Sequence, residues 1–195
     1  TAAATVKTAT IFATNLVATA ALEGQDITVE VSIGAERYIE HGIYVGKNVT
    51  LRGATGNRDD VVIGPNSRAT GTTTYRVITA SGQGAVVADL TIINGYTYAR
   101  PSSGSAAISG NGGGGIYLNS GSVITNCHIT TCGAKYNSYA PGMRISSAYA
   151  YDVLVDKCIQ DSAGDRENRG YAVYVSGNSI VERCQIVDNE AKGVK

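Results

Sequence analysis

One three-residue phrase recurs five times along this chain of 195 residues, and it constrains the fold more than any other feature. Each copy places apolar residues on either side of a variable middle residue, and only Gln160 breaks the pattern. The interval between copies shortens steadily along the chain; the copies are Val49–Leu51, Leu90–Ile92, Cys127–Ile129, Cys158–Gln160 and Cys184–Ile186. Strands that keep their pattern while their connections change in length are typical of a solenoid of stacked coils.

Three copies of the phrase begin with cysteine, at Cys127, Cys158 and Cys184, which predicts a column of small buried side chains. Cys132 is the fourth cysteine, no CxxC pair occurs, and the chain has only two histidines, so a zinc site is not expected. The alternative is a disulfide between adjacent coils, because neighbouring strands lie ~4.8 Å apart, near the short end of the range a disulfide accepts. The thiol state is left open.

The composition excludes several classes of partner. Sixteen basic residues balance sixteen acidic ones, so the charge favours neither nucleic acid nor an anionic membrane surface. No apolar run approaches the ~20 residues that span a bilayer, so membrane insertion is not expected. The first residues, Thr1–Ala4, lack the basic and apolar parts of a secretory signal, so we expect either a removed leader or an excised fragment.

The rest of the pattern predicts one domain over residues 1–195, with a helix followed by coils. Residues 7–23 are rich in alanine and predict an amphipathic helix that caps the first coil, ended by Gly24. Residues 27–190 predict about five coils of three strands each, and 191–195 resemble the start of another coil, so we expect a longer solenoid. The predicted first strands are 27–31, 61–63, 116–118, 143–145 and 173–175, the second strands are 43–45, 77–79, 123–124, 153–155 and 180–181, and the phrases are the third.

Five short segments carry a family resemblance. Gly24–Val29, Tyr38–Glu40, Ile43–Val45 and Asn48–Ala54 resemble the opening of right-handed parallel β-helix proteins of the pectate-lyase-like superfamily, and Leu90–Gly95 is similar to its repeats. The expected fold is therefore all-β: a right-handed parallel β-helix with an N-terminal capping α-helix. The resemblance implies an extracellular or cell-surface location, and a functional site on the outer face of the first-strand sheet and its adjoining loops.

That outer face carries a column of Tyr117, Arg144 and Tyr174, one residue from each of three successive coils. An arginine between two tyrosines can form a stacked cation–π arrangement. The column therefore predicts either a contact that only stabilises the surface of the sheet, or a platform that binds sugar rings and acidic saccharides. The predicted loops beside it, 93–115 and 130–142, add further candidate ligand-binding residues, namely Tyr96, Tyr98, Tyr136 and Tyr139.

Catalytic and metal sites are less clearly marked. Lyases of the superfamily use a basic residue to abstract a proton, which makes Arg144 the candidate catalytic residue. Asp161, Asp165 and Glu167 are the candidate ligands of a Ca²⁺ ion, with arginines interleaved among them. The arginine motif of pectate lyases and the aspartate and His-Gly pattern of polygalacturonases are absent, and the Asp59–Asp60 pair is interpreted as a solvated turn.

The sequence therefore favours a non-catalytic extracellular or cell-surface module that binds a glycan or a surface protein, or serves as a stiff stalk. The alternative is a carbohydrate-active enzyme, a polysaccharide lyase or glycoside hydrolase that acts on an acidic polysaccharide. A second alternative is self-association through the last coil, since the end of a β-helix is a template for another chain.

Overall fold

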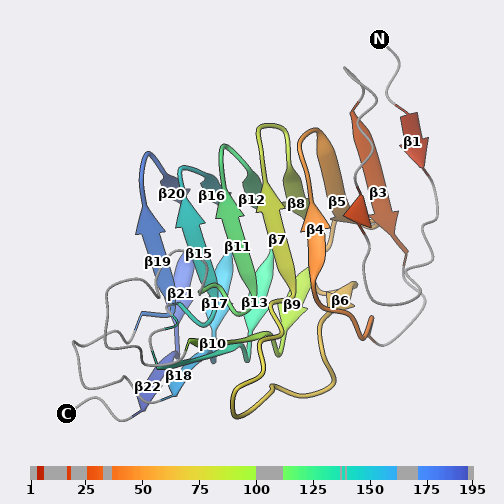
Figure 1. The fold of residues 1–195 in the computed structure, drawn as a ribbon. Coiled ribbons are helices and arrows are strands. Elements are labelled where there is room, and N and C mark those ends of the chain that lie inside the picture. The colour runs from red at the N-terminus through yellow and green to blue at the C-terminus, as the bar shows by residue number, and fades with distance from the viewer. Residues whose placement is uncertain are drawn as a thin grey trace.

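The computed structural model describes residues 4–6, 17–18, 26–32, 37–99, 112–136, 138, 140–161 and 171–192. Within these ranges all regular structure is β-strand, and every strand pairs in parallel with equivalent strands of the neighbouring coils. The coils stack along one axis, which runs from the N-terminal strands to the C-terminal ones (Figure 1). The predicted all-β coil architecture is therefore confirmed.

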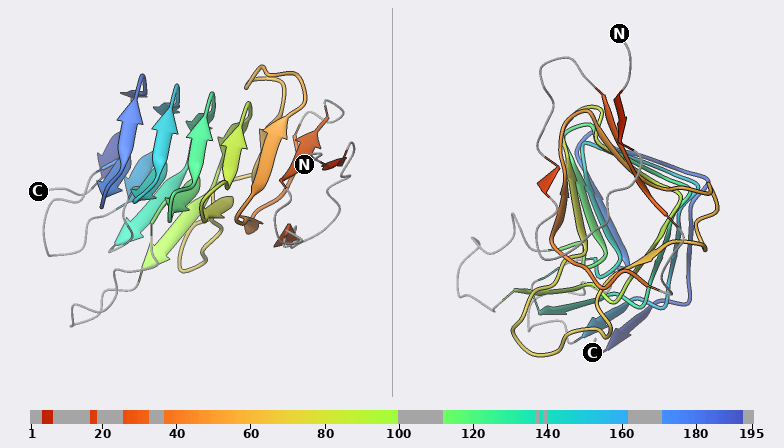
Figure 2. Two further views of the ribbon diagram at one scale, coloured as in Figure 1. Left: turned by 90° about the horizontal axis from the view of Figure 1, so that it is seen from above. Right: turned by 90° about the vertical axis from the view of Figure 1, so that its right-hand side faces the viewer.

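Each full coil passes through four sheets, named here A to D, in the order B, A, C, D. Seen along the axis, the coils superimpose as a prism (Figure 2). Sheet A contains β1 (Ala4–Val6), β3 (Ile27–Val31), β5 (Val49–Gly53), β8 (Val86–Ala88), β12 (Val123–Thr125), β16 (Tyr149–Tyr151) and β20 (Ile180–Glu182). Sheet B contains β2 (Val17–Ala18), β4 (Ile43–Val45), β7 (Ile78–Ser81), β11 (Ile116–Asn119), β15 (Met143–Ser146) and β19 (Val173–Ser176).

The other two sheets are smaller. Sheet C contains β6 (Val62–Ile63), β9 (Thr91–Ile93), β13 (His128–Thr130), β17 (Leu154–Asp156) and β21 (Gln185–Val187). Sheet D contains β10 (Tyr96–Ala99), β14 (Gly133–Tyr136), β18 (Ile159–Asp161) and β22 (Glu190–Lys192). Sheet D was missed by the sequence analysis, which assigned 93–115 and 130–142 to loops.

A single residue with positive φ turns the chain from sheet A to sheet C. This corner is occupied in successive coils by a column of polar residues that we call the corner column: Asp89, Asn126, Asp152 and Arg183, with φ of 58°, 47°, 56° and 53°. Aspartate and asparagine adopt this conformation more readily than most residues, because their short side chains bond locally to the backbone. The single polar residue that separates the two apolar strands in the sequence therefore forms a sharp corner in the structure.

The core is built from columns of aliphatic side chains that point into the prism. Register places Ile63, Ile92, Ile129, Val155 and Ile186 at one position of sheet C in successive coils. The first four are completely buried, whereas Ile186 on the last described coil is 49% exposed. The predicted inward positions of β4, β11 and β15 are likewise buried, which confirms the period-two alternation.

The assignment of strands to sheets was partly wrong. Residues 43–45 and 77–79 were expected to be second strands, but β4 pairs with β7 and β7 pairs with β11, in the sheet that holds the predicted first strands. Val49–Leu51 lies in sheet A beside Ile27–Val31, which was expected to belong to a different sheet. The five phrases are spread over three sheets, A, C and D, so their apolar–x–apolar spacing cannot tell one sheet from another.

The predicted single cysteine column is also wrong. Leu154 N donates to Cys127 O (3.0 Å) and Gln185 N donates to Val153 O (2.9 Å), so Val153 separates Cys127 from Cys184 in sheet C. Cys158 precedes a strand of sheet D instead, where its thiol contacts that of Cys132 on the neighbouring coil. All four cysteines are free thiols in the structure.

The predicted capping helix falls almost entirely outside the described residues. Its described portion, Val17–Ala18, is strand β2, which pairs with β4 and so extends sheet B. At these two positions the structure differs from the helix that was expected. Within the described part of the chain, no helix is long and apolar enough to cross a membrane.

Replacement of equivalent core residues should show that burial depends on having a coil on each side. We expect Ile129→Ala to lower the free energy of unfolding by about 2–5 kcal/mol, because it leaves a cavity in a fully buried site. Ile186→Ala, at the same position of the exposed coil, is the matched control and should cost under about 1 kcal/mol. Urea denaturation followed by circular dichroism measures both, and equal losses would contradict the stacking argument.

The thiols should differ in reactivity with a disulfide reagent. Burial raises the pKa of Cys127 to about 12 and also raises the pKa of Cys132, and Cys158 is fully buried. Cys184 is only half-buried, although burial raises its pKa too. We therefore expect Cys184 to react first in the native protein and the other three only on unfolding. Rapid labelling of all four thiols, or a shortage of free thiols, would contradict this expectation.

Candidate functional site

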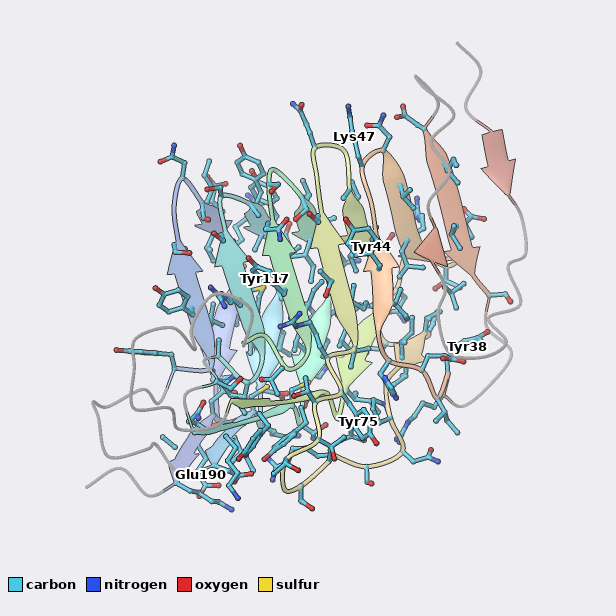
Figure 3. All side chains as sticks on the ribbon, viewed as in Figure 1. Tyr38, Tyr44, Lys47, Tyr75, Tyr117 and Glu190 are labelled. Atoms are coloured by element: carbon cyan, nitrogen blue, oxygen red, sulfur yellow. The ribbon has the colours of Figure 1, made fainter. Side chains whose placement is uncertain are left out.

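The outer face of sheet B carries one continuous column of side chains. Because successive residues of a strand point to opposite faces, the burial of Ile116 and Leu118 turns Tyr117 outward. Register extends this outward position over five coils, and Figure 3 shows the two labelled tyrosines of that face, Tyr44 and Tyr117. The column consists of Tyr44, Thr79, Tyr117, Arg144 and Tyr174.

Two arginines flank one tyrosine of this column. The guanidinium carbon of Arg144 lies 5.0 Å from the ring centre of Tyr117 and 5.9 Å from that of Tyr174, which confirms the predicted stacking. The guanidinium carbon of Arg76 lies 5.2 Å from the Tyr117 ring centre. These four residues, called the Arg–Tyr cluster below, place cationic and aromatic groups together on one outer surface.

Arg76 was missed by the sequence analysis because it lies just before β7, outside the periodic pattern. Its Nη2 donates to Gly112 O (2.8 Å) and its Nη1 donates to Thr79 Oγ1 (3.4 Å), so the side chain is fixed beside the sheet. Burial lowers the pKa of Arg76, and the positive charge of Arg144 lowers it further, while Tyr117 opposes both effects. The two guanidinium groups therefore concentrate positive charge at the cluster.

The cluster presents mainly tyrosine to solvent. Arg144 is only 8% exposed, whereas Tyr117 and Tyr174 are half-buried. A ligand at this surface would therefore meet the tyrosine side chains first, with the guanidinium groups stacked over the ring of Tyr117 behind them. This arrangement fits a binding surface, and the predicted catalytic role of Arg144 stays a prediction.

The predicted loop wall is only partly as expected. Tyr96 is completely buried within β10, where its backbone pairs with Tyr75, so its side chain exposes no surface, and its predicted binding role stays a prediction. Tyr98 is half-buried in the same strand, and its backbone N–H donates to Thr74 Oγ1 (3.1 Å). Tyr136 belongs to β14, but its side chain lies outside the described residues, as does all of Tyr139.

The candidate calcium ligands are described only at Asp161, at the end of β18. Its carboxylate lies 3.9 Å from Arg68 Nη2, in an ion pair that links sheet D to the 65–75 connection. Asp165 and Glu167 lie outside the described residues. Among the residues that the structure describes, no three His, Cys, Asp or Glu side chains gather to hold a metal ion, and the calcium site stays a prediction.

The sequence of the chain places it in a known family. Residues 47–195 match the model of the right-handed β-helix region, so the chain belongs to this family and the resemblance noted from the sequence is confirmed. Among solved structures it is similar to a pectin methylesterase from Yersinia enterocolitica, with 16% sequence identity, a TM-score of 0.40 and coverage of 90% of this chain. The chain spans 64% of the length of that protein. None of the curated proteins compared with it matches.

A polar pair, His128 and Asp156, lies on the outer face of sheet C. His128 Nε2 lies 2.9 Å from Asp156 Oδ1. Burial raises the pKa of Asp156, but hydrogen bonds from Thr130 and His128 outweigh that effect, so the net pKa is lowered. Because the pair joins adjacent coils, we interpret it as a contact that stabilises the stacking of the coils.

Replacing Asp156 should change how stability depends on pH. Since the pKa of Asp156 is lower in the folded state, its contribution is fully present above about pH 5 and is lost as the pH falls through ~3.9 and below. We therefore expect the wild-type protein to be more stable than Asp156→Asn at pH 6, with the difference shrinking toward pH 3. Urea titrations across this range measure it, and a difference that grows as the pH falls would contradict the assignment.

Proposed function

We propose that this chain is a non-catalytic β-helix module that binds an acidic glycan at the Arg–Tyr cluster, at the cell surface or outside the cell. The observation that carries the proposal is the Tyr117 ring flanked by the guanidinium groups of Arg76 and Arg144. Guanidinium groups attract carboxylates and form charge-assisted hydrogen bonds with them, and the exposed parts of the tyrosine side chains beside them offer contact area to a sugar ring.

The framework under the cluster supports this proposal. Parallel hydrogen bonds hold β11, β15 and β19 side by side, so Tyr117, Arg144 and Tyr174 stand one strand spacing, ~4.8 Å, apart along the axis. A polymer chain that lies along the axis would meet these residues on successive coils. Side chains fixed by such a sheet lose little freedom on binding, which favours affinity.

Titration with a hexamer of galacturonate, followed by calorimetry, tests the proposal. We expect Tyr174→Ala to weaken binding at least about tenfold, because it removes the aromatic surface next to Arg144. Tyr44→Ala is the matched control, since Tyr44 lies on the same face but on a coil beyond Thr79, and it should leave binding unchanged. Affinity should also fall as salt is raised.

Absence of binding to the hexamer, or an equal loss in Tyr44→Ala and Tyr174→Ala, would contradict the proposal. Shortening of the hexamer during the titration would instead favour the enzyme alternative, and Arg144→Ala should then abolish the shortening. Repeating the titration with calcium and with a chelator tests the predicted Ca²⁺ site.

Association with a surface protein or with a second copy of the chain stays a proposal of lower rank. The apolar side chains exposed on the last described coil, at Val175, Ile180, Ile186 and Val187, favour a further layer on that face. Light scattering over a range of protein concentrations would measure self-association.

A further inference from the structure

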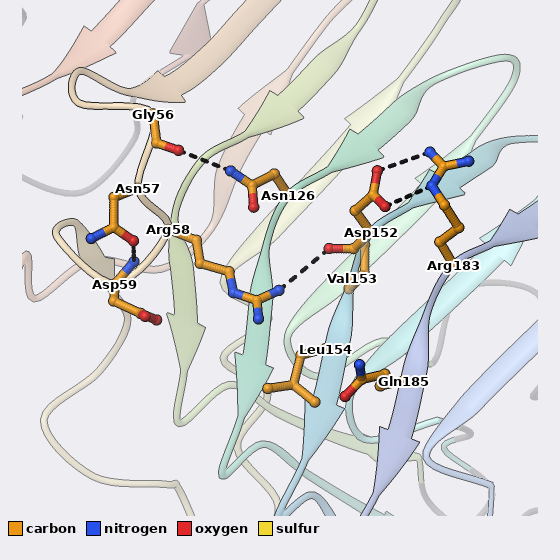
Figure 4. Close-up of a pocket in the computed structure, with 10 residues that line it drawn as sticks. All are labelled: Gly56, Asn57, Arg58, Asp59, Asn126, Asp152, Val153, Leu154, Arg183 and Gln185. Atoms are coloured by element: carbon orange, nitrogen blue, oxygen red, sulfur yellow. Dashed lines mark hydrogen bonds and ion pairs between the residues drawn. The ribbon is translucent and has the colours of Figure 1, made fainter.

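A second surface of the molecule forms a polar groove. It lies on the outside of sheet C, beside the corner between sheets A and C, and encloses about 450 Å³ (Figure 4). This volume falls within the ~300–1,000 Å³ typical of small-molecule sites. The groove is lined by residues 56–59, Asn126, residues 152–154, Arg183 and Gln185.

One wall of the groove is the 54–60 connection between β5 and β6, which reaches over three later coils. Asn126 Nδ2 donates to Gly56 O (2.9 Å), and Thr91 Oγ1 donates to Arg58 O (2.8 Å), so the middle of the wall is held against the strands behind it. The Arg58 guanidinium extends further and donates from Nη1 to Asp152 O (3.4 Å). The groove is thus built by contacts between distant parts of the chain.

The other wall is the corner column. Asn126, Asp152 and Arg183 occupy the same position on three successive coils, and their side chains leave the prism at the edge of the groove. Arg183 donates from Nε (2.7 Å) and Nη2 (2.9 Å) to the two carboxylate oxygens of Asp152. This two-point pairing fixes both side chains, because each group is planar.

The lining combines charges of both signs. The positive charges of two arginines balance the negative charges of two aspartates, so the groove attracts neither a polyanion nor a polycation. The amide of Gln185 adds both donors and acceptors, whereas the amides of Asn57 and Asn126 bond within the protein. Leu154, on the strand next to that of Gln185, supplies an apolar patch. Alternating donors and acceptors beside a small apolar patch suit a ligand rich in hydroxyl groups.

We propose that this groove binds a segment of an uncharged glycan. The sugar hydroxyl groups would exchange hydrogen bonds with the Asp59, Gln185 and Arg58 side chains, and a C–H face would rest on Leu154. The proposal goes beyond the function proposed above, because the groove lies on sheet C and the Arg–Tyr cluster on sheet B. Either site can therefore be lost without the other.

Nuclear magnetic resonance of the ¹⁵N-labelled protein tests this inference with neutral hexamers of glucose, mannose and xylose joined by β-1,4 bonds. At least one hexamer should shift the amide signals of 56–59, 126, 152–154 and 185. The double variant Asp59→Ala/Gln185→Ala removes two exposed lining side chains and should weaken that binding about tenfold or more.

Two controls separate the sites. Glu190→Ala removes an exposed side chain from the same last coil outside the groove, and Tyr174→Ala removes one from the Arg–Tyr cluster; both should bind the neutral hexamer as the wild type does. The inference is overturned if none of the three hexamers binds more tightly than about 10 mM. It is equally overturned if the shifts map to sheet B, or if the double variant binds like the wild type.

Discussion

Parallel hydrogen bonding between equivalent strands of successive coils is the interaction on which the rest of this structure depends. It fixes the register, and the register places each side chain above the residue at the same position of the previous coil. The aliphatic column from Ile63 to Val155, the Arg–Tyr cluster and the corner column are all products of this one constraint. The same hydrogen bonds between coils align the core columns on the inner face of the strands and the polar columns on the outer face.

The parts of the fold that follow from period-two alternation could be predicted from the sequence. The inward Ile116 and Leu118 and the outward Tyr117 beside Arg144 are examples, because a strand needs only its own residues to set its two faces. The assignment of Val49–Leu51 to a sheet failed, since the same phrase suits every sheet. Strand β14 (Gly133–Tyr136) was missed because it lacks alternating aliphatic residues.

The candidate sites were predictable only where they lie on the strands. Arg76 was missed because it lies in an irregular connection, yet it completes the surroundings of Tyr117. The groove on sheet C was missed for a similar reason: Arg58 contacts Asp152, a residue 94 positions away, and nothing in the local pattern reveals that contact. Asp59, interpreted from the sequence as part of a solvated turn, is exposed as expected but lines that groove.

The direction of the backbone hydrogen bonds has a mechanical consequence. Because these bonds run from coil to coil, they lie nearly along the axis of the prism, unlike the bonds of a sheet whose strands run lengthwise. A pull that separates whole coils loads the bonds of all four sheets together, whereas a pull on a chain end breaks them one after another. The molecule should therefore resist a force that pulls the first and last coils apart along the axis. It should yield more easily to a force on one end of the chain, which unwinds the coils one at a time.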